Sequence, residues 1–348
     1  MGRSGREKMG GEGNMKLTPR ENYLRMLNHE IPEYVPSSYD NFRDMVSEEL
    51  LTPVFAPGGK VITSFGVEYL GSPEFGYGAT PNPNKIICPE ITEWDKYIIK
   101  PDVSDRDWEA YYKAQEGRWD RTNHLLSIGG SDYWLTAVSF MGFENTVIAM
   151  YEEPDAFKEM LEYVSEFYLE VMKQEIYYCK PDLFGMMDDD AAYHAPFFSL
   201  DMYREFFKPL QQKHIDLAKE NGMLVTRHDC GKCEQFVPDW IEMDVRAWNP
   251  AQVSNDLVGI KKKYGNAIAL EGAWDSQGEL GRADCDIQTL KDALAVYVDT
   301  FAPGGGFTYS AHLSGVDQKD PRVIERNKVI RDFYEDYVRN YYIDHGEY

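Results

Sequence analysis

Three residues with metal-binding side chains lie close together at His228, Cys230 and Cys233. They follow an apolar run at 223–225, which predicts a short buried strand that ends near Arg227. Imidazole and thiolate are ligand types that zinc prefers, and side chains two residues apart in extended backbone point to the same side. The sequence therefore predicts a zinc site with His228 and Cys230 as ligands, and with Cys233 as a candidate fourth. The alternative is a buried histidine beside two free thiols.

Polar side chains also follow the other predicted strands, at the point where each strand ends. They are Asp188 and Asp189 after residues 183–187, Asn249 and Gln252 after 245–248, Glu271, Trp274 and Asp275 after 267–270, and His312 after 305–310. In a parallel barrel the carboxyl ends of the strands converge on one face, where active sites are built. We therefore expect these side chains to form one pocket, in which carboxylates and amides surround a metal.

Alternating strand and helix patterns predict a parallel α/β fold. The strands are expected at 34–40, 125–130, 183–187, 223–227, 245–248, 267–270 and 305–310, and the helices at 18–27, 108–124, 154–179, 199–221, 233–240, 257–264, 287–301 and 320–341. This alternation and the chain length favour a closed (β/α)8 TIM barrel with an irregular and helical N-terminal extension. A doubly wound open sheet is the competing architecture, but no GxGxxG follows an early strand, so a dinucleotide site has no support.

Three segments fall outside this alternation. Residues 1–14 are polar and Gly-rich and predict a flexible leader or a cloning remnant, which leaves 15–348 as a single barrel domain. Residues 48–101 are rich in Gly, Pro and Asn and predict an irregular or hairpin region that covers a site. The residues that follow the strand at 125–130 are expected to form a loop that holds Asp132, Trp134 and Phe140.

The composition excludes several classes of protein. Hydrophobic residues make up 43% of the 348, which is typical of a globular chain. A net charge of −23 argues against nucleic acid or an anionic membrane as partner, although it suits docking to another protein. No apolar run is long enough to cross a bilayer, and the N-terminus has no signal-peptide core. Five unevenly spaced cysteines do not predict disulfides, so we expect a cytoplasmic protein.

A series of motifs runs through most of the chain. They are LTPRENYLRML at 17–27, YEEPDAF at 151–157, two aspartates followed by SxxMYREFFKP at 199–209, HxCG at 228–231 and NPAQ at 249–252. This series resembles the uroporphyrinogen decarboxylase superfamily. Within it, HxCG resembles the corrinoid-dependent methyltransferases, which are similar to coenzyme M methyltransferases in binding a catalytic zinc.

The resemblance implies a third zinc ligand after the last barrel strand. These methyltransferases have a cysteine there, whereas this chain has His312. One thiolate and two neutral imidazoles leave zinc with a net charge of about +1, which makes it a better Lewis acid and a poorer activator of thiols. We therefore expect O-demethylation, in which a Co(I) corrinoid on a partner protein takes the methyl group of a small donor. A methoxylated aromatic is the preferred donor, because a phenolate is a tolerable leaving group.

Further roles are predicted around this centre. Asp188 and Asp189 are candidates for orienting His228 or for acid catalysis, and the alternative for either aspartate is that it caps a loop. Glu271 is a further catalytic candidate that is expected to approach the metal or the substrate. Asn249 and Gln252 are expected to hydrogen-bond the substrate. The candidate aromatic walls are Tyr193, Trp274, Trp134, Phe140 and Trp248, although such rings more often pack structurally.

Three other interpretations stay open. A metal-free decarboxylase would have to grip many carboxylates, but the segment VPSSYDNFRDM supplies only Arg43. A methyl-corrinoid methyltransferase that acts on a thiol would use the same zinc in the opposite direction. A binding protein without activity could retain the pocket. The sequence does not settle the oligomeric state, and a homodimer is one option.

Overall fold

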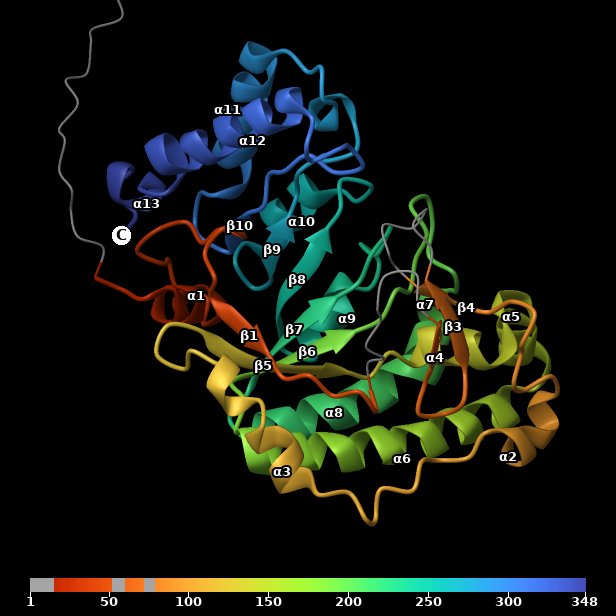
Figure 1. Ribbon diagram of the computed structural model, residues 1–348. Helices are drawn as coiled ribbons and strands as arrows, with labels where there is room; N and C mark the ends of the chain where they lie inside the picture. The colour runs from red at the N-terminus through yellow and green to blue at the C-terminus, as the bar shows by residue number, and fades with distance from the viewer. Residues whose placement is uncertain (1–15, 52–59, 72–78) are drawn as a thin grey trace, which may run out of the picture.

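A curved sheet of seven parallel strands forms the centre of the protein (Figure 1). In this computed structural model the described residues are 16–51, 60–71 and 79–348, so the predicted leader lies outside them. In spatial order the strands are β1 (Arg43–Met45), β5 (Leu125–Gly130), β6 (Leu183–Met187), β7 (Leu224–His228), β8 (Val245–Ala251), β9 (Ala269–Gly272) and β10 (Phe307–Tyr309). Their carboxyl ends therefore share one edge, as the sequence predicts.

The two ends of this sheet are joined by the residues that precede β1. Ser37 forms a parallel bridge with Tyr309, and the Tyr309 amide donates a hydrogen bond to the carbonyl of Pro36 at 2.8 Å. A few residues later, β1 pairs with β5 at the other end of the sheet. This arrangement confirms the TIM-barrel-like fold. The strand predicted at 34–40 contributes only this bridge, so seven strands, not eight, lie in the described part of the barrel.

Helices follow the strands and cover the outside of the sheet (Figure 1). They are α1 (Pro19–Leu27), α2 (Trp94–Tyr97), α3 (Trp108–Lys113), α4 (Tyr133–Met141), α5 (Phe143–Glu152), α6 (Pro154–Cys179), α7 (Leu200–Met202), α8 (Lys208–Glu220), α9 (Val237–Glu242), α10 (Leu257–Tyr264), α11 (Ile287–Phe301), α12 (Pro321–Phe333) and α13 (Tyr341–Asp344). A π-helical turn, Tyr203–Phe207, separates α7 from α8 directly before Pro209, which divides the helix as predicted. Among the described residues, none of the helices is both long and apolar enough to cross a bilayer.

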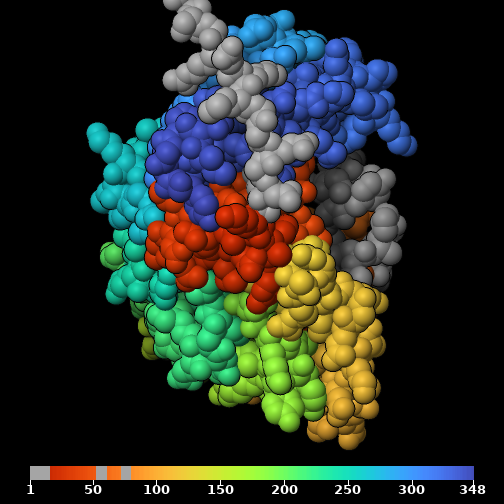
Figure 2. All heavy atoms as spheres, turned by 90° about the vertical axis from the view of Figure 1, so that its left-hand side faces the viewer, coloured from red at the N-terminus to blue at the C-terminus, as the bar shows by residue number. Residues whose placement is uncertain are grey.

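The first helix closes the amino-terminal end of the barrel. Tyr23, Met26 and Leu27 of α1 are fully buried and pack against the first residues of several strands, among them Leu125 and Leu183. Figure 2 shows the N-terminal residues, in red, between the C-terminal residues in blue and residues of the middle of the chain in green. The N-terminal extension is thus part of the barrel core and not an appendage.

A small antiparallel sheet occupies the region that the sequence assigns to a hairpin. Its strands are β2 (Lys60–Ile62), β3 (Glu68–Gly71) and β4 (Ala79–Pro81). Phe65, in the turn between β2 and β3, packs on Phe140 of α4 and Phe167 of α6 at ring-centroid distances of 5.5 and 5.4 Å. The sheet is therefore held to the barrel by an aromatic contact.

The prediction of a loop after β5 is wrong, because these residues form the helix α4. Seven of the nine residues of α4 are buried, so the helix has no polar face and its sequence shows no amphipathic period. Its N-terminus is also capped from a different part of the chain. The Asp188 carboxylate accepts hydrogen bonds from the amides of Trp134 and Leu135 at 2.9 and 3.1 Å. A cap that comes from β6 leaves no local signal in the sequence of α4.

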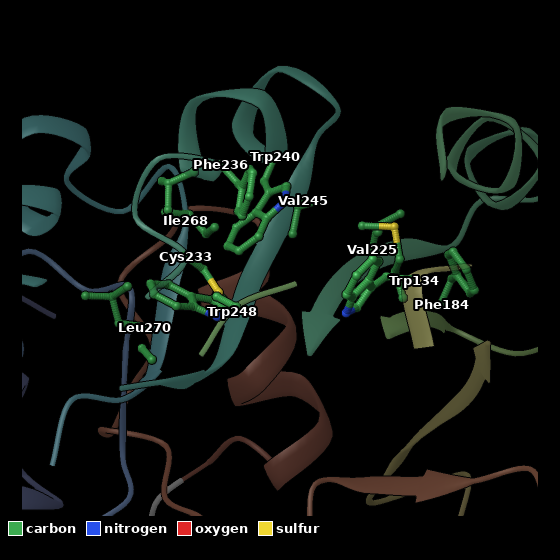
Figure 3. Packing of buried hydrophobic residues seen from close by; sticks show 14 of the residues in the cluster. Trp134, Phe184, Val225, Cys233, Phe236, Trp240, Val245, Trp248, Ile268 and Leu270 are labelled. Carbon is green, nitrogen blue, oxygen red and sulfur yellow. The ribbon is translucent and has the colours of Figure 1, made fainter. Parts of the chain in front are cut away.

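Trp134 is the largest side chain in this part of the core. It is 1% exposed and lies against Phe143, Phe197, Phe198 and Phe207 at ring-centroid distances of 5.2–6.4 Å. Figure 3 shows Trp134 together with Phe184 and Val225 of the neighbouring strands. The ring therefore joins α4 to the helix after β6.

We expect Trp134→Ala to lower the free energy of unfolding by about 3–5 kcal/mol, because it leaves a cavity among these rings. Tyr151→Ala is the control: this side chain is 70% exposed on the neighbouring helix, and its loss should change stability by less than about 0.5 kcal/mol. Urea unfolding measures both variants. Equal effects would show that Trp134 does not hold this region together.

Candidate metal site and substrate pocket

Asp189, His228 and Cys230 come together where β6 and β7 end. Their ligand atoms all lie within 4.8 Å of one another. Cys230 Sγ is 3.7 Å from His228 Nε2, and His228 Nε2 is 3.9 Å from Asp189 Oδ1. The side chains of His228 and Asp189 are 40% and 38% exposed, so an ion can reach them. The parallel pairing of Met187 with His228 places the three groups at one level.

The ring of His228 is oriented by an amide. His228 Nδ1 donates a hydrogen bond to Asn249 Oδ1 at 2.9 Å, and Asn249 Nδ2 donates to Glu271 Oε2 at 3.2 Å. Because the amide nitrogen faces a carboxyl group, the amide oxygen faces the imidazole. The Nδ1 proton is thereby fixed, and the lone pair of Nε2 points toward Cys230 and Asp189. Asn249 therefore orients the ring of His228, and its predicted contact with substrate stays a prediction.

Glu271 anchors this hydrogen-bond chain from inside the barrel. It also accepts from the Tyr23 hydroxyl, and its Oε2 is 3.3 Å from Arg43 Nη2. Burial raises the pKa of Glu271 to about 8. Within the described residues Glu271 is not part of the group that could hold an ion, and it supports Asn249 instead. Its catalytic role stays a prediction.

The Cys230 thiol lies in a tight turn. Burial, followed by the negative charge of Asp189, raises the pKa of this thiol to about 12. A bound cation reverses this effect, because it stabilises the thiolate directly. Gly231 has φ +86°, and a Cβ there would lie 2.3 Å from the carbonyl oxygen of Ala191. Only glycine therefore allows the turn to approach the loop after β6 so closely.

The second cysteine of the CxxC pair points away from the site. Cys233 is fully buried, and its Sγ lies 3.1 Å from Asp229 Oδ1 and 3.0 Å from the carbonyl oxygen of Cys230, the two acceptors available to its one proton. Figure 3 shows it next to Trp248 in the core. Cys233, a candidate fourth ligand in the sequence, is thus outside the group formed by Asp189, His228 and Cys230.

The two aspartates after β6 have different surroundings. Asp189 faces the site and accepts a hydrogen bond from the amide of Cys230 at 3.0 Å. Asp188 is fully buried, caps α4 and lies outside the group. Burial raises the pKa of Asp188 to about 7. Asp188 therefore has the structural role that the sequence left open for it, because it caps the segment after the neighbouring strand.

His312 lies outside the group that the described residues form around His228. Its ring is exposed, and Nδ1 donates to the carbonyl of Ser310 at 2.8 Å. The Trp274 indole donates to the carbonyl of His312 at 3.0 Å, which holds the backbone at this position. Asp189 therefore has the third place in this geometry, and ligation by His312 stays a prediction.

A pocket of about 310 Å³ adjoins the site. Three of the four predicted substrate residues, Tyr193, Gln252 and Trp274, line this pocket. The rest of the lining comes from Val253, Asp275 and residues 276–278. Gln252 Oε1 accepts a hydrogen bond from the amide of Gly231 at 2.7 Å, which links the pocket to the Cys230 turn. Trp134, Phe140 and Trp248 are at most 1% exposed and are core residues, so their prediction as pocket walls is wrong.

Sequence reasoning missed a buried charged cluster beneath the site. Arg227, the last residue but one of β7, pairs with Asp190 and Asp229. All three side chains are 0% exposed. The available signal was an arginine at the end of an otherwise apolar strand.

Comparison with known proteins places this geometry in a family. Residues 74–294 match the uroporphyrinogen decarboxylase (URO-D) family. The chain belongs to that family. Among solved structures, a methyltransferase from Methanosarcina mazei is similar, with a TM-score of 0.63 and 13% identity over 92% of this chain and 100% of that one. At this identity the likeness shows a shared fold. No curated protein matches the chain.

The raised pKa of Glu271 predicts a pH dependence of stability. The folded state holds this proton up to about pH 8, whereas the unfolded carboxyl releases it near pH 4.5, so ionisation opposes folding between these values. Relative to wild type, Glu271→Gln should gain stability as pH rises through this window, at up to about 1.4 kcal/mol per pH unit. Urea unfolding at pH 5, 6.5 and 8 measures the difference. A difference that does not change with pH would contradict the assignment.

Proposed function

We propose that the protein is a zinc-dependent methyltransferase that moves a methyl group from a small methylated donor to the Co(I) corrinoid of a partner protein. The observation that carries the proposal is the group of Asp189, His228 and Cys230 at the carboxyl ends of the strands, with the imidazole tautomer already set. Family membership and the shared fold of a methyltransferase support it.

The three side chains suit zinc. They offer one nitrogen, one sulfur and one oxygen, which are the donor types of protein zinc sites, and three protein ligands leave a fourth position open. Zinc bound there supplies a Lewis acid for an oxygen of the donor. Asn249 and Glu271 hold the imidazole in place for this task.

The adjoining pocket favours an aromatic donor. Tyr193 and Trp274 present ring surfaces, and a volume of about 310 Å³ is large enough for a substituted benzene ring. Because Gln252 contacts the Cys230 turn, a ring in this pocket would lie beside the metal ligands. We therefore propose O-demethylation of a methoxylated aromatic, in which Co(I) takes the methyl group and the oxygen leaves as a phenolate. Zinc held by Asp189, His228 and Cys230 would stabilise the charge on this oxygen.

The identity of the third ligand affects the direction of transfer. The sequence predicts a net charge of about +1 for zinc with His312, whereas Asp189 in its place makes the site neutral, as two thiolates would. This neutrality favours a second candidate, a methyl-corrinoid methyltransferase that acts on a thiol. A decarboxylase of porphyrinogens fits less well. A porphyrinogen carries many carboxylates, which need several basic partners. Among the described residues, the pocket of about 230 Å³ beside Glu271 is lined by one basic residue, Arg43, and Arg43 pairs with Glu271.

Metal analysis decides between Asp189 and His312. We expect wild type to bind one zinc ion, and Asp189→Ala and Cys230→Ala to weaken binding by at least about 10-fold, because each removes a direct ligand. His312→Ala should bind as wild type does. Asp292→Ala, an exposed acidic residue on α11, is the control. Zinc content after dialysis and competition with a chelator give the affinities. Loss of zinc in His312→Ala, with full binding in Asp189→Ala, would show that His312 and not Asp189 is the third ligand.

Activity is tested with a reduced free corrinoid and a panel of methoxylated aromatics, by following methyl-cobalt absorbance. We expect methyl transfer in wild type and a loss of about 100-fold in Cys230→Ala. Trp274→Ala should mainly raise KM, because it removes a wall of the pocket and not a metal ligand. Methyl transfer from methyl-cobalamin to a thiol, with none from any methoxylated aromatic, would select the second candidate.

A further inference from the structure

The buried cluster beneath the site joins the two loops that carry the ligands. Arg227 Nη2 lies 2.5 Å from Asp190 Oδ2 and 2.5 Å from Asp229 Oδ2, and Arg227 Nε donates to the same Asp229 oxygen at 3.0 Å. The Trp240 ring covers the guanidinium, with its centroid 4.7 Å from Cζ. One fully buried side chain therefore holds two carboxylates, one from the loop after β6 and one from the loop after β7.

Each of these carboxylates is next to a ligand in the chain. Asp190 follows Asp189, and Asp229 lies between His228 and Cys230. The amide of Asp190 donates to Asp229 Oδ1 at 2.9 Å, so the two loops are also joined directly. The amide of Asp229 donates to the carbonyl of Asn249 at 2.9 Å, which ties both loops to β8. A shift of either aspartate would thus move a ligand.

The cluster also contains more carboxyl groups than cations. One guanidinium faces Asp190, Asp229 and, further away, Asp188. Among the described residues, Asp190 Oδ1 and Arg227 Nη1 make no hydrogen bond. Such a cluster is expensive to bury, and well-packed apolar side chains would stabilise a fold at least as well. The geometry of the cluster instead favours a role in positioning the two loops that carry Asp189 and Cys230.

We propose that Arg227 is the positioning residue of the metal site: by clamping Asp190 and Asp229 it holds Asp189 and Cys230 at the separation that one divalent cation requires. This inference rests on the proposed metal-dependent function. The Arg227 side chain is fully buried, so it acts through the two aspartates and not by contact with a metal or a substrate.

The test compares Arg227→Lys with Arg20→Lys. Lysine keeps the charge but cannot bind two carboxylates through a fixed fork. Arg20 is a matched control, because both its Nη atoms bind Asp182 at 2.6 Å, directly before the opposite end of β6. Titration with Co²⁺ should show about 10- to 100-fold weaker binding and an altered cobalt absorption spectrum in Arg227→Lys. Arg20→Lys should bind Co²⁺ as wild type does, even where its melting temperature falls equally.

A second measurement does not need the metal. Cys230 is the one partly exposed cysteine, since Cys88, Cys179, Cys233 and Cys285 are buried. Mass spectrometry can therefore follow alkylation of Cys230 by iodoacetamide in the metal-free protein. Alkylation should be faster in Arg227→Lys than in wild type and unchanged in Arg20→Lys, because only the first change loosens the turn at Cys230.

The outcomes separate the two claims. If wild type binds Co²⁺ and folded Arg227→Lys binds it equally well, the positioning role is overturned. If wild type binds no Co²⁺, the proposed function fails, and the alkylation rate alone decides: a faster rate supports the clamp and an unchanged rate overturns it. If Arg227→Lys does not fold, Asp190→Asn replaces it, since this change weakens one arm of the clamp and keeps the size of the side chain. It should shift both readouts in the same direction.

Discussion

The hydrogen bond from His228 Nδ1 to Asn249 Oδ1 determines what the site can do. It leaves Nε2 as the free nitrogen and turns it toward a thiol and a carboxylate. The bond exists because Glu271 orients the amide, and Glu271 is in turn held by Tyr23 of α1 and by Arg43 of β1. The helix that closes the bottom of the barrel thus contributes to the orientation of an imidazole at its mouth.

Two separate networks therefore converge on the site. One runs through the barrel interior from α1 to His228 and fixes a ring. The other lies between β7 and the helices outside, where Arg227 fixes the loops that carry Asp189 and Cys230. Both use buried polar and ionisable groups, which are tolerated only where several partners satisfy them. Together the two networks set the ring of His228 and the spacing of the loops that carry Asp189 and Cys230, and such preorganisation would limit the reorganisation that binding of an ion requires.

Much of the fold could be predicted, because the strand patterns are strong. The bounds of β5, β6, α6, α10 and α11 agree with the sequence prediction, as does the pairing of His228 with Cys230. Long-range facts could not be predicted. Adjacent residues at a strand end face opposite directions, and the sequence does not say which of Asp188 and Asp189 caps α4. Nor does it show that Ser310 engages the His312 ring, or that α4 is buried on every side and so lacks a period.

The most direct test of the account is a crystal structure of the zinc-loaded protein with anomalous data at the zinc edge. The account predicts one peak, bonded to His228 Nε2, Cys230 Sγ and a carboxylate oxygen of Asp189, at about 2.0–2.3 Å from each. The His228–Asn249 hydrogen bond should be unchanged. Zinc bound through His228 Nδ1, or no zinc between these three side chains, would contradict it.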